Sequence, residues 1–277
     1  MISYSRQSIS QADIDAVVAV LKSDFLTQGP VVEQFEQAFA AACGATYAIA
    51  VNSATSALHI ACLALGVKAG DWVWTSPNTF VASANCARYC GAEVDFVDID
   101  PLTFNLSVPL LEAKLAAAER ANRLPKVIIP VHFAGLPCDM VSISNLARKY
   151  GVQLIEDASH AVGARYADGT LVGSGAYSDV TIFSFHPVKI MTTGEGGAAT
   201  TADSQLARKL ARLRSHGITR DADEMTKPSE GPWYYQQTTL LGLNYRMTEF
   251  QAALGSSQLV KVPAWVKRRN DLAENYR

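Results

Sequence analysis

A lysine that follows an apolar stretch is the first group in this sequence whose chemistry stands out. Residues 180–185 are mostly apolar, Lys189 comes a few positions later, and a glycine-rich stretch at residues 194–197 follows it. Open α/β sheets bind ligands at the carboxyl ends of their strands, which is where this lysine would lie. An isolated lysine is more often a solvated surface residue. Its interpretation therefore depends on its neighbours.

An acidic pair and a histidine follow another apolar stretch. Glu156 and Asp157 come directly after residues 152–155, and His160 is three positions further on. A carboxylate beside the nitrogen of a bound pyridine ring keeps that ring protonated, so that it can draw electrons from a carbanion. His160 could orient the carboxylate or touch the ring. The alternatives are an N-cap role for Asp157 and a core position for His160.

A turn of small polar residues offers a site for an anion. Residues 52–58 contain Asn52, Ser53, Thr55 and Ser56 between a predicted strand and a predicted helix. Free backbone N–H groups and the helix dipole favour an anion at such a start, and hydroxyl groups add donors. The same residues are also common helix caps, so this signal alone is weak.

The elements that position these groups alternate between helices and short strands. This alternation predicts an α/β protein with a largely parallel sheet. The expected helices span about residues 30–44, 53–65, 80–89, 108–121 and 140–150, and the expected strands about 47–51, 72–75, 94–97, 127–131 and 153–156.

The first helix is expected to begin at a capping box. Ser10 and Asp13 have the required spacing, and Ile14, Val18 and Leu21 fall on one helix face with Val17. No Pro-, Ser- or Gly-rich linker marks a domain boundary. A polar stretch at residues 221–237 is expected to form a long loop.

Composition argues against several classes of protein. The formal charge of the 277 residues is -2, too close to zero to indicate a nucleic-acid or anionic-membrane surface. No stretch reaches the ~20 apolar residues of a membrane span, and the first residues lack a signal-peptide core. We therefore expect a cytoplasmic protein. We also expect no metal site, because Cys86 and Cys90 have no second Cys or His pair at ligand spacing. The five cysteines are expected to be reduced core thiols.

Taken together, the motifs resemble those of the DegT/DnrJ/EryC1/StrS aminotransferases. These are fold-type I enzymes that use pyridoxal 5′-phosphate (PLP) and act on nucleotide sugars. The resemblance runs along nearly the whole chain in family order. The stretches that carry it are residues 26–30, 52–58, 79–85, 97–100, 156–161, 184–197 and 244–255.

The resemblance implies a role for several single residues. Lys189 matches the Schiff-base lysine, and Asp157 matches the partner of the pyridinium nitrogen. His160 is expected beside them as a catalytic and cofactor-binding residue. The other cofactor-binding residues that the resemblance implies are Ala54, Thr55 and Ser184 at the phosphate, Phe80 against the ring, and Asn244 reaching the phosphate of the other subunit. The implied assembly is a homodimer with shared active sites.

Finer details point to one branch of the family. The N-terminal residues 4–7, the Ser159–His160 pair and residues 214–217 look most like PseC-type enzymes. Those enzymes transfer an amino group from glutamate to C4 of a UDP-linked 4-keto-6-deoxy-N-acetylhexosamine on the way to pseudaminic acid. Tyr4, Arg6 and His186 are the candidate substrate residues.

The implied fold is an aspartate aminotransferase-like large domain with a mostly parallel seven-stranded sheet between helices. We expect this PLP-binding domain at residues 1–260 and the start of a shortened C-terminal domain at residues 261–277. Three alternatives remain open at this point. They are another 4-keto nucleotide-sugar aminotransferase, a non-catalytic binding protein, and a PLP-dependent sugar dehydratase, the last disfavoured because such relatives carry histidine in place of Lys189.

Overall fold

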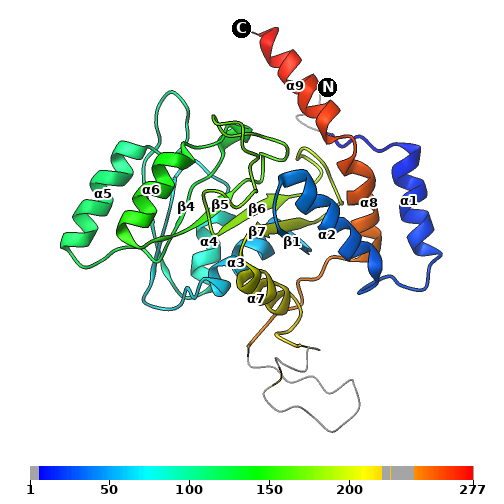
Figure 1. The fold of residues 1–277 in the computed structure, drawn as a ribbon, viewed down its shortest axis with the longest axis horizontal. Helices are drawn as coiled ribbons and strands as arrows, with labels where there is room; N and C mark the ends of the chain where they lie inside the picture. The colour runs from blue at the N-terminus through cyan, green and yellow to red at the C-terminus, as the bar shows by residue number, and fades with distance from the viewer. Residues whose placement is uncertain (1–5, 220–224, 226–239, 277) are drawn as a thin grey trace.

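The computed structural model describes residues 6–219, 225 and 240–276. Along this part of the chain, helices and strands alternate as the periodicity predicted (Figure 1). None of the helices formed by these residues is long and apolar enough to cross a membrane. The strands are β1 (Tyr47–Val51), β2 (Trp72–Thr75), β3 (Glu93–Phe96), β4 (Val127–Ile129), β5 (Gln153–Asp157), β6 (Val180–Ser184) and β7 (Gly197–Thr201).

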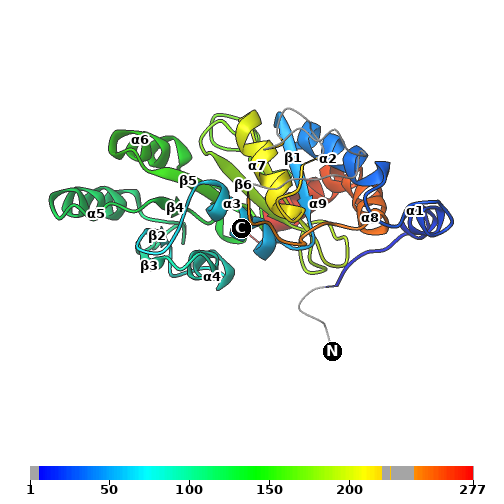
Figure 2. The same ribbon diagram turned by 90° about the horizontal axis from the view of Figure 1, so that it is seen from below.

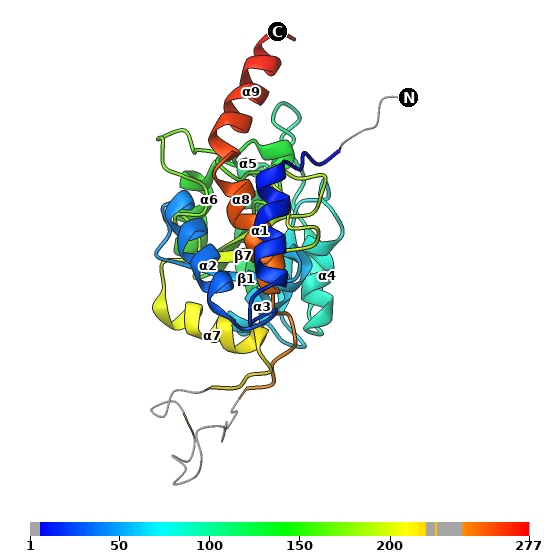
Figure 3. The ribbon, with the colours of Figure 1, turned by 90° about the vertical axis from the view of Figure 1, so that its right-hand side faces the viewer.

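The helices surround these strands. They are α1 (Gln11–Leu21), α2 (Pro30–Cys43), α3 (Ala54–Ala64), α4 (Ala82–Tyr89), α5 (Val108–Arg120), α6 (Met140–Tyr150), α7 (Ser204–Arg214), α8 (Glu249–Leu259) and α9 (Val262–Glu274), with the short 3-10 helix η1 (Phe133–Gly135). In Figures 1 and 3, α9 continues beyond the end of α8 and projects from the body of the molecule.

The strands form one seven-stranded sheet in the order β1-β7-β6-β5-β4-β2-β3. The pairs β6–β5, β5–β4, β4–β2 and β2–β3 are parallel, whereas β7 is antiparallel to both of its neighbours. Six strands therefore run in one direction and only β7 opposes them. This arrangement confirms the mostly parallel sheet that the sequence predicted.

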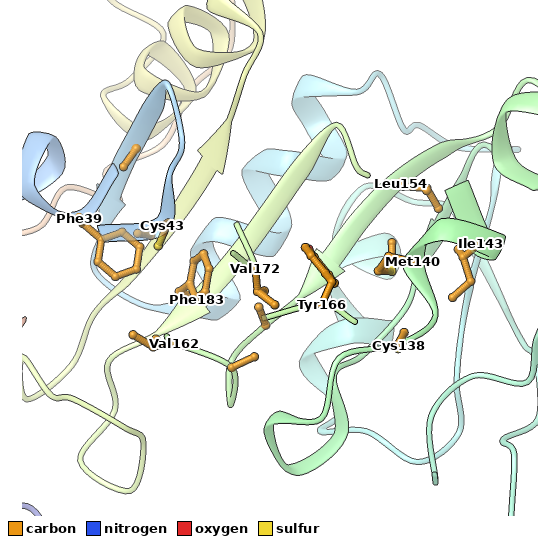
Figure 4. Close-up of a cluster of buried hydrophobic side chains, with 14 of the residues drawn as sticks. Phe39, Cys43, Cys138, Met140, Ile143, Leu154, Val162, Tyr166, Val172 and Phe183 are labelled. Atoms are coloured by element: carbon orange, nitrogen blue, oxygen red, sulfur yellow. The ribbon is translucent and has the colours of Figure 1, made fainter. Parts of the chain in front are cut away.

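Hydrophobic clusters cover both faces of the sheet. Phe39 of α2, Phe183 of β6 and Met140 of α6 belong to one cluster, part of which is shown in Figure 4. Leu58 of α3 and Ile182 of β6 belong to the other. Side chains of neighbouring strand residues point to opposite faces, so one strand serves both clusters. Figure 2 shows α6 and α4 on opposite sides of the strands.

Several predicted boundaries differ from the structure by one or two residues. α4 begins at Ala82, which leaves Phe80 in the segment before the helix. β3 covers Glu93–Phe96, one residue earlier than expected, because Glu93 pairs with Trp72 and Phe96 with Thr75 in the parallel ladder with β2.

Helix α1 buries a different face from the one its apolar residues suggested. Its capping box at Ser10 is confirmed, but Ile14, Val18 and Leu21 are exposed. Asp13 is instead fully buried against α8 and α9, where its carboxylate accepts hydrogen bonds from Lys261, Ser257 and Gln258. These polar contacts orient the helix more strongly than its apolar periodicity does. Figure 3 shows α1 beside α8.

Candidate active site

Asp157 and Ser184 are the last residues of two adjacent parallel strands. Both strands run in the same direction, so the two residues reach the same edge of the sheet. Asp157 lies on the same side of β5 as Ile155, and Ser184 on the same side of β6 as Ile182. Because Ile155 and Ile182 belong to the cluster under α3, α4 and α7, both polar side chains are directed toward that face.

The carboxylate of Asp157 is held by hydroxyl groups. Its Oδ2 accepts a hydrogen bond from Ser83 Oγ at 2.6 Å, and its Oδ1 accepts from Ser159 Oγ at 2.6 Å and from the Ser159 backbone N–H at 3.1 Å. Thr79 Oγ1 lies 2.8 Å from Ser83 Oγ. Asp157 is only 5% exposed. These contacts fix the orientation of a nearly buried carboxylate.

Lys189 and His160 meet at this edge. The Nζ of Lys189 lies 2.7 Å from Nε2 of His160, and a backbone hydrogen bond of 2.9 Å from Lys189 N–H to His186 O closes the turn after β6. Burial lowers the pKa of Lys189 from its usual value, although the nearby charge of Asp157 opposes this effect. Burial and the charge of Lys189 also lower the pKa of His160. A neutral imidazole can accept a hydrogen bond from the lysine amine.

The N-terminus of α3 forms a second part of the site. Ser53 is its N-cap, and the Ser53 Oγ accepts a hydrogen bond from the backbone N–H of Ser56 at 3.1 Å. The N–H groups of Ala54 and Thr55 belong to the first turn and have no acceptor within the helix. They provide donors for an anion, supported by the helix dipole.

The antiparallel strand β7 brings the two parts together. Its first residue, Gly197, pairs with Val51 of β1 on one side and with Ser184 of β6 on the other. A Cβ at Gly197 would lie 2.5 Å from the backbone N of Ala54. Only glycine therefore allows β7 to pass this close to the start of α3.

A buried network lies on the opposite face of β5, and the sequence did not reveal it. Glu156 accepts hydrogen bonds from His132 Nε2 at 2.9 Å and from Tyr166 Oη at 2.6 Å. His132 Nδ1 accepts from the Cys138 backbone N–H, so its proton is on Nε2. Burial opposes ionisation of Glu156, but the hydrogen bond from His132 keeps its pKa below the usual value. The network anchors the strand end that carries Asp157.

Ser83 is the second contribution that sequence reasoning missed. It lies in a stretch that carried the family resemblance, but nothing in its local pattern distinguishes it from a helix residue. Ser83 and Asp157 are 74 positions apart in the chain. Only the order of the strands brings α4 over the end of β5.

Two predicted cofactor residues lie outside this group of contacts. Phe80 precedes α4 and is 74% exposed, and its predicted contact with the cofactor ring stays a prediction. Asn244 is exposed and forms an antiparallel backbone bridge with Ser215. Its predicted reach into another subunit also stays a prediction.

The candidate substrate residues are dispersed. Tyr4 is outside the described residues. His186 is exposed in the turn before Lys189, where its Nδ1 accepts a hydrogen bond of 3.4 Å from the Val188 N–H. Arg6 is also exposed and lines a cavity together with Lys189. The structure thus places Arg6 and Lys189 on the wall of the same cavity, whereas His186 is joined to Lys189 by the backbone hydrogen bond of the turn.

Comparison with known proteins identifies the family of the chain. The model of the DegT/DnrJ/EryC1/StrS aminotransferase family matches residues 7–277. The chain belongs to this family. Membership confirms the resemblance on which the residue roles were predicted, and it relates the chain to enzymes that transfer amino groups.

Within the family, the chain is similar to enzymes that are named as sugar aminotransferases. The chain is 42% identical over 280 residues to the UDP-4-amino-4,6-dideoxy-N-acetyl-beta-L-altrosamine transaminase of Campylobacter jejuni, covering all of this chain and 69% of the relative. Helicobacter pylori PseC has a TM-score of 0.83 at 33% identity, covering 94% of this chain and 66% of that one. The PLP form of the putative sugar aminotransferase Spr1654 from Streptococcus pneumoniae has a TM-score of 0.86 at 30% identity, covering 99% and 70%. The chain thus spans about two thirds of these relatives.

The residues at the sheet edge fit PLP, the cofactor of this aminotransferase family. Lys189 offers an amine of lowered pKa for the aldehyde, and Asp157 offers an oriented carboxylate for the ring nitrogen. The first turn of α3 and Ser184 offer donors for the phosphate. The close approach that Gly197 permits brings these phosphate donors together.

Proposed function

We propose that the chain transfers an amino group from glutamate to C4 of a UDP-linked 4-keto-6-deoxy-N-acetylhexosamine. The observation that carries the proposal is the meeting of Lys189 Nζ with His160 Nε2 at 2.7 Å, within the electrostatic influence of Asp157. The substrate is inferred from the activities for which the relatives from Campylobacter jejuni and Helicobacter pylori are named.

Lys189 performs the proton transfers in this proposal. Its lowered pKa increases the share of neutral amine near pH 7. A neutral Nζ can accept the proton from Cα of glutamate and later deliver a proton to C4 of the sugar. His160 accepts a hydrogen bond from Nζ and so keeps the amine directed toward the reacting carbon.

Asp157 supplies the negative charge that the chemistry needs. When bound, the pyridine ring of PLP withdraws electrons from the substrate carbon that loses its proton. Ser83 and Ser159 donate to both carboxylate oxygens and hold them in place. An oriented, nearly buried carboxylate favours the protonated ring more than a mobile surface carboxylate would.

The proposal includes a homodimer whose active sites are shared. It follows the predicted role of Asn244 at the phosphate of the other subunit. The exposed positions of Asn244, Phe80, Ile14 and Val18 leave these side chains available to a second copy of the chain.

A spectroscopic and product assay tests the proposed function. The 277-residue chain, loaded with PLP, is mixed with glutamate while the cofactor absorption is recorded, and 4-keto nucleotide sugars are then added as a panel. We expect glutamate to convert the cofactor to its amino form and the UDP-linked substrate to yield the 4-amino product by mass spectrometry. Lys189→Ala should lower turnover roughly 100-fold or more, and Lys68→Ala, an exposed lysine before β2, should not.

The same assay separates the alternatives. Preferential amination of a different 4-keto sugar would change the proposed substrate but leave the proposed reaction, an amino-group transfer, unchanged. Consumption of the sugar without glutamate would indicate a dehydratase. Bound PLP that never reacts with glutamate would indicate a binding protein and would refute the proposal.

A further inference from the structure

A cationic cavity adjoins the loop that carries Lys189. It has a volume of about 210 Å³, and its wall includes Lys189, Arg6, Arg268 and Arg269. None of the described residues that line it is acidic; the other lining residues are polar or apolar. Four basic side chains on a wall whose described residues carry no carboxylate create a positive potential that attracts an anion.

Buried polar contacts hold the walls of this cavity together. Gln258 of α8, only 1% exposed, donates from Nε2 to Ser8 O at 3.0 Å and to Asp13 Oδ2 at 2.9 Å. Lys261 Nζ lies 2.7 Å from both oxygens of Asp13 and 2.7 Å from Ser10 Oγ. These contacts tie the segment that carries Arg6 to the junction of α8 and α9.

The first turns of α9 supply the opposite wall. Trp265, Arg268 and Arg269 are spaced at i, i+3 and i+4, so they lie on one face of the helix. On the same helix, Lys267 is already paired with Asp271 at 2.8 Å. Among the described residues, neither Arg268 nor Arg269 forms a salt bridge. Their guanidinium groups are therefore available to bind a carboxylate or phosphate through two parallel hydrogen bonds.

We propose that this cavity binds the dicarboxylate amino donor, whose side-chain carboxylate pairs with Arg268 and Arg269 while its amino group reaches Lys189. The inference rests on the proposed function and adds to it the site that recognises the donor. The cavity is smaller than the ~300–1,000 Å³ clefts that hold drug-sized ligands. A five-carbon dicarboxylate matches this size, whereas a whole nucleotide sugar exceeds it. Arg6 provides the cation for the second carboxylate.

Glutarate is the probe for this site because it has both carboxylates of glutamate but no amino group to react. It is titrated calorimetrically into the PLP-loaded 277-residue chain, and uridine diphosphate is titrated separately. The variant Arg268→Gln/Arg269→Gln should bind glutarate roughly tenfold more weakly. Its affinity for uridine diphosphate should be unchanged. The variant Arg268→Lys/Arg269→Lys should retain part of the affinity because it keeps the charge.

A remote arginine variant and a folding measurement serve as controls for the glutarate titration. Arg120→Gln, at the end of α5 and remote from the cavity, should leave glutarate binding unchanged (Figure 1). Circular dichroism of each variant establishes that it is folded. Equal glutarate affinity in the chain and its double Gln variant would overturn the inference. Weaker binding of uridine diphosphate but not of glutarate would also overturn it, since the cavity would then belong to the nucleotide.

A half-reaction distinguishes this inference from the proposed function. In that experiment, the absorption of bound PLP is followed with L-glutamate and with L-alanine at several concentrations. An increase of KM for L-glutamate in the double Gln variant, without an equal change for L-alanine, supports the inference. Unchanged KM values together with normal conversion of PLP would refute the donor site and leave the proposed function standing. If neither amino acid converts PLP, the proposed function is refuted, and the glutarate titration then tests the donor site by itself.

Discussion

At the scale of single residues, the chemistry depends on groups that orient other groups. Asp157 receives two hydroxyl hydrogen bonds, and Lys189 is held by His160. The hydroxyl hydrogen bonds to the charged carboxylate of Asp157 are short and strong, so they restrict it to one geometry. We therefore expect Ser83 and His160 to act as positioning residues, whose removal should affect catalysis more than folding.

Ser83→Ala removes one of the hydroxyl donors to Asp157. Because a hydrogen bond to a charged group contributes about 1.5–3 kcal/mol, we expect turnover with glutamate to fall roughly tenfold while the fold is retained. Ser142→Ala is the matched control, since Ser142 Oγ donates to Asp139 Oδ2 at 2.7 Å in an exposed contact at the start of α6. Steady-state kinetics of both variants checks the expectation, and equal rates would show that Ser83 does not support Asp157.

The thiol of Cys90 is expected to be more reactive than the thiol of Cys43. Contact with Cys62 and with His59 lowers the pKa of Cys90 to about 6, whereas burial raises the pKa of Cys43 to about 12. The thiolate is the reactive form, so alkylation of Cys90 by iodoacetamide should increase as pH rises from 5 to 7. Peptide mass spectrometry measures both sites, and Cys43 should stay unmodified. A flat pH profile for Cys90 would contradict the lowered pKa.

At the scale of elements, the site is formed where helix starts meet strand ends. The parallel strands β5 and β6 end at one edge, and α3 begins beside the same edge. β7 runs in the opposite direction, so its first residue, Gly197, lies at this edge as well. The proposed phosphate site thus depends on a single close approach between a strand and a helix.

Gly197→Ala tests that close approach. The added Cβ would lie 2.5 Å from the backbone N of Ala54, so the start of α3 has to shift. We expect the free energy of unfolding to decrease by about 1–3 kcal/mol and the affinity for PLP to fall. Denaturant titration and an absorbance titration with PLP measure the two effects.

Gly151→Ala is the control for Gly197→Ala, because it introduces backbone strain without a steric contact. Gly151 has a positive φ of 67° and open space around its Cβ position. Its substitution should cost about 1 kcal/mol of stability without changing the affinity for PLP. Equal PLP affinities for Gly197→Ala and the unchanged chain would show that the approach to α3 does not form the phosphate site.

At the scale of the whole molecule, several apolar and polar groups face outward. Ile14 and Leu21 of α1 are exposed because Asp13 turns the other face of the helix inward, and Phe80 is exposed beside α4. Exposed apolar side chains of this kind are available for contact with a second copy of the chain.

Subunit complementation tests the shared site directly. Lys189→Ala and Asn244→Ala variants are each expected to have low activity as homodimers. Mixing them under dissociating conditions and reassembling them should restore activity, because each mixed dimer contains one site with both native residues. Turnover before and after mixing is the measurement. Activity that never exceeds the sum of the two variants would show that Asn244 does not act across subunits.

The sequence by itself determined the elements and the main chemical groups. Apolar periodicity is a local property, so β1, β2, α2 and α6 could be located from short windows. The position of Lys189 and Asp157 just after apolar stretches placed both at strand ends, and the family resemblance assigned their roles. Comparison with known proteins confirmed the family, and the structure confirmed the mostly parallel sheet.

Only the tertiary structure decided which distant groups meet. Strand order places Ser83 against Asp157, and the buried contacts of Asp13 decide which face of α1 points inward. The cationic cavity likewise joins the N-terminal segment to α9 through Gln258. Local patterns cannot specify such contacts, because strand pairing and the satisfaction of buried polar groups depend on the chain as a whole.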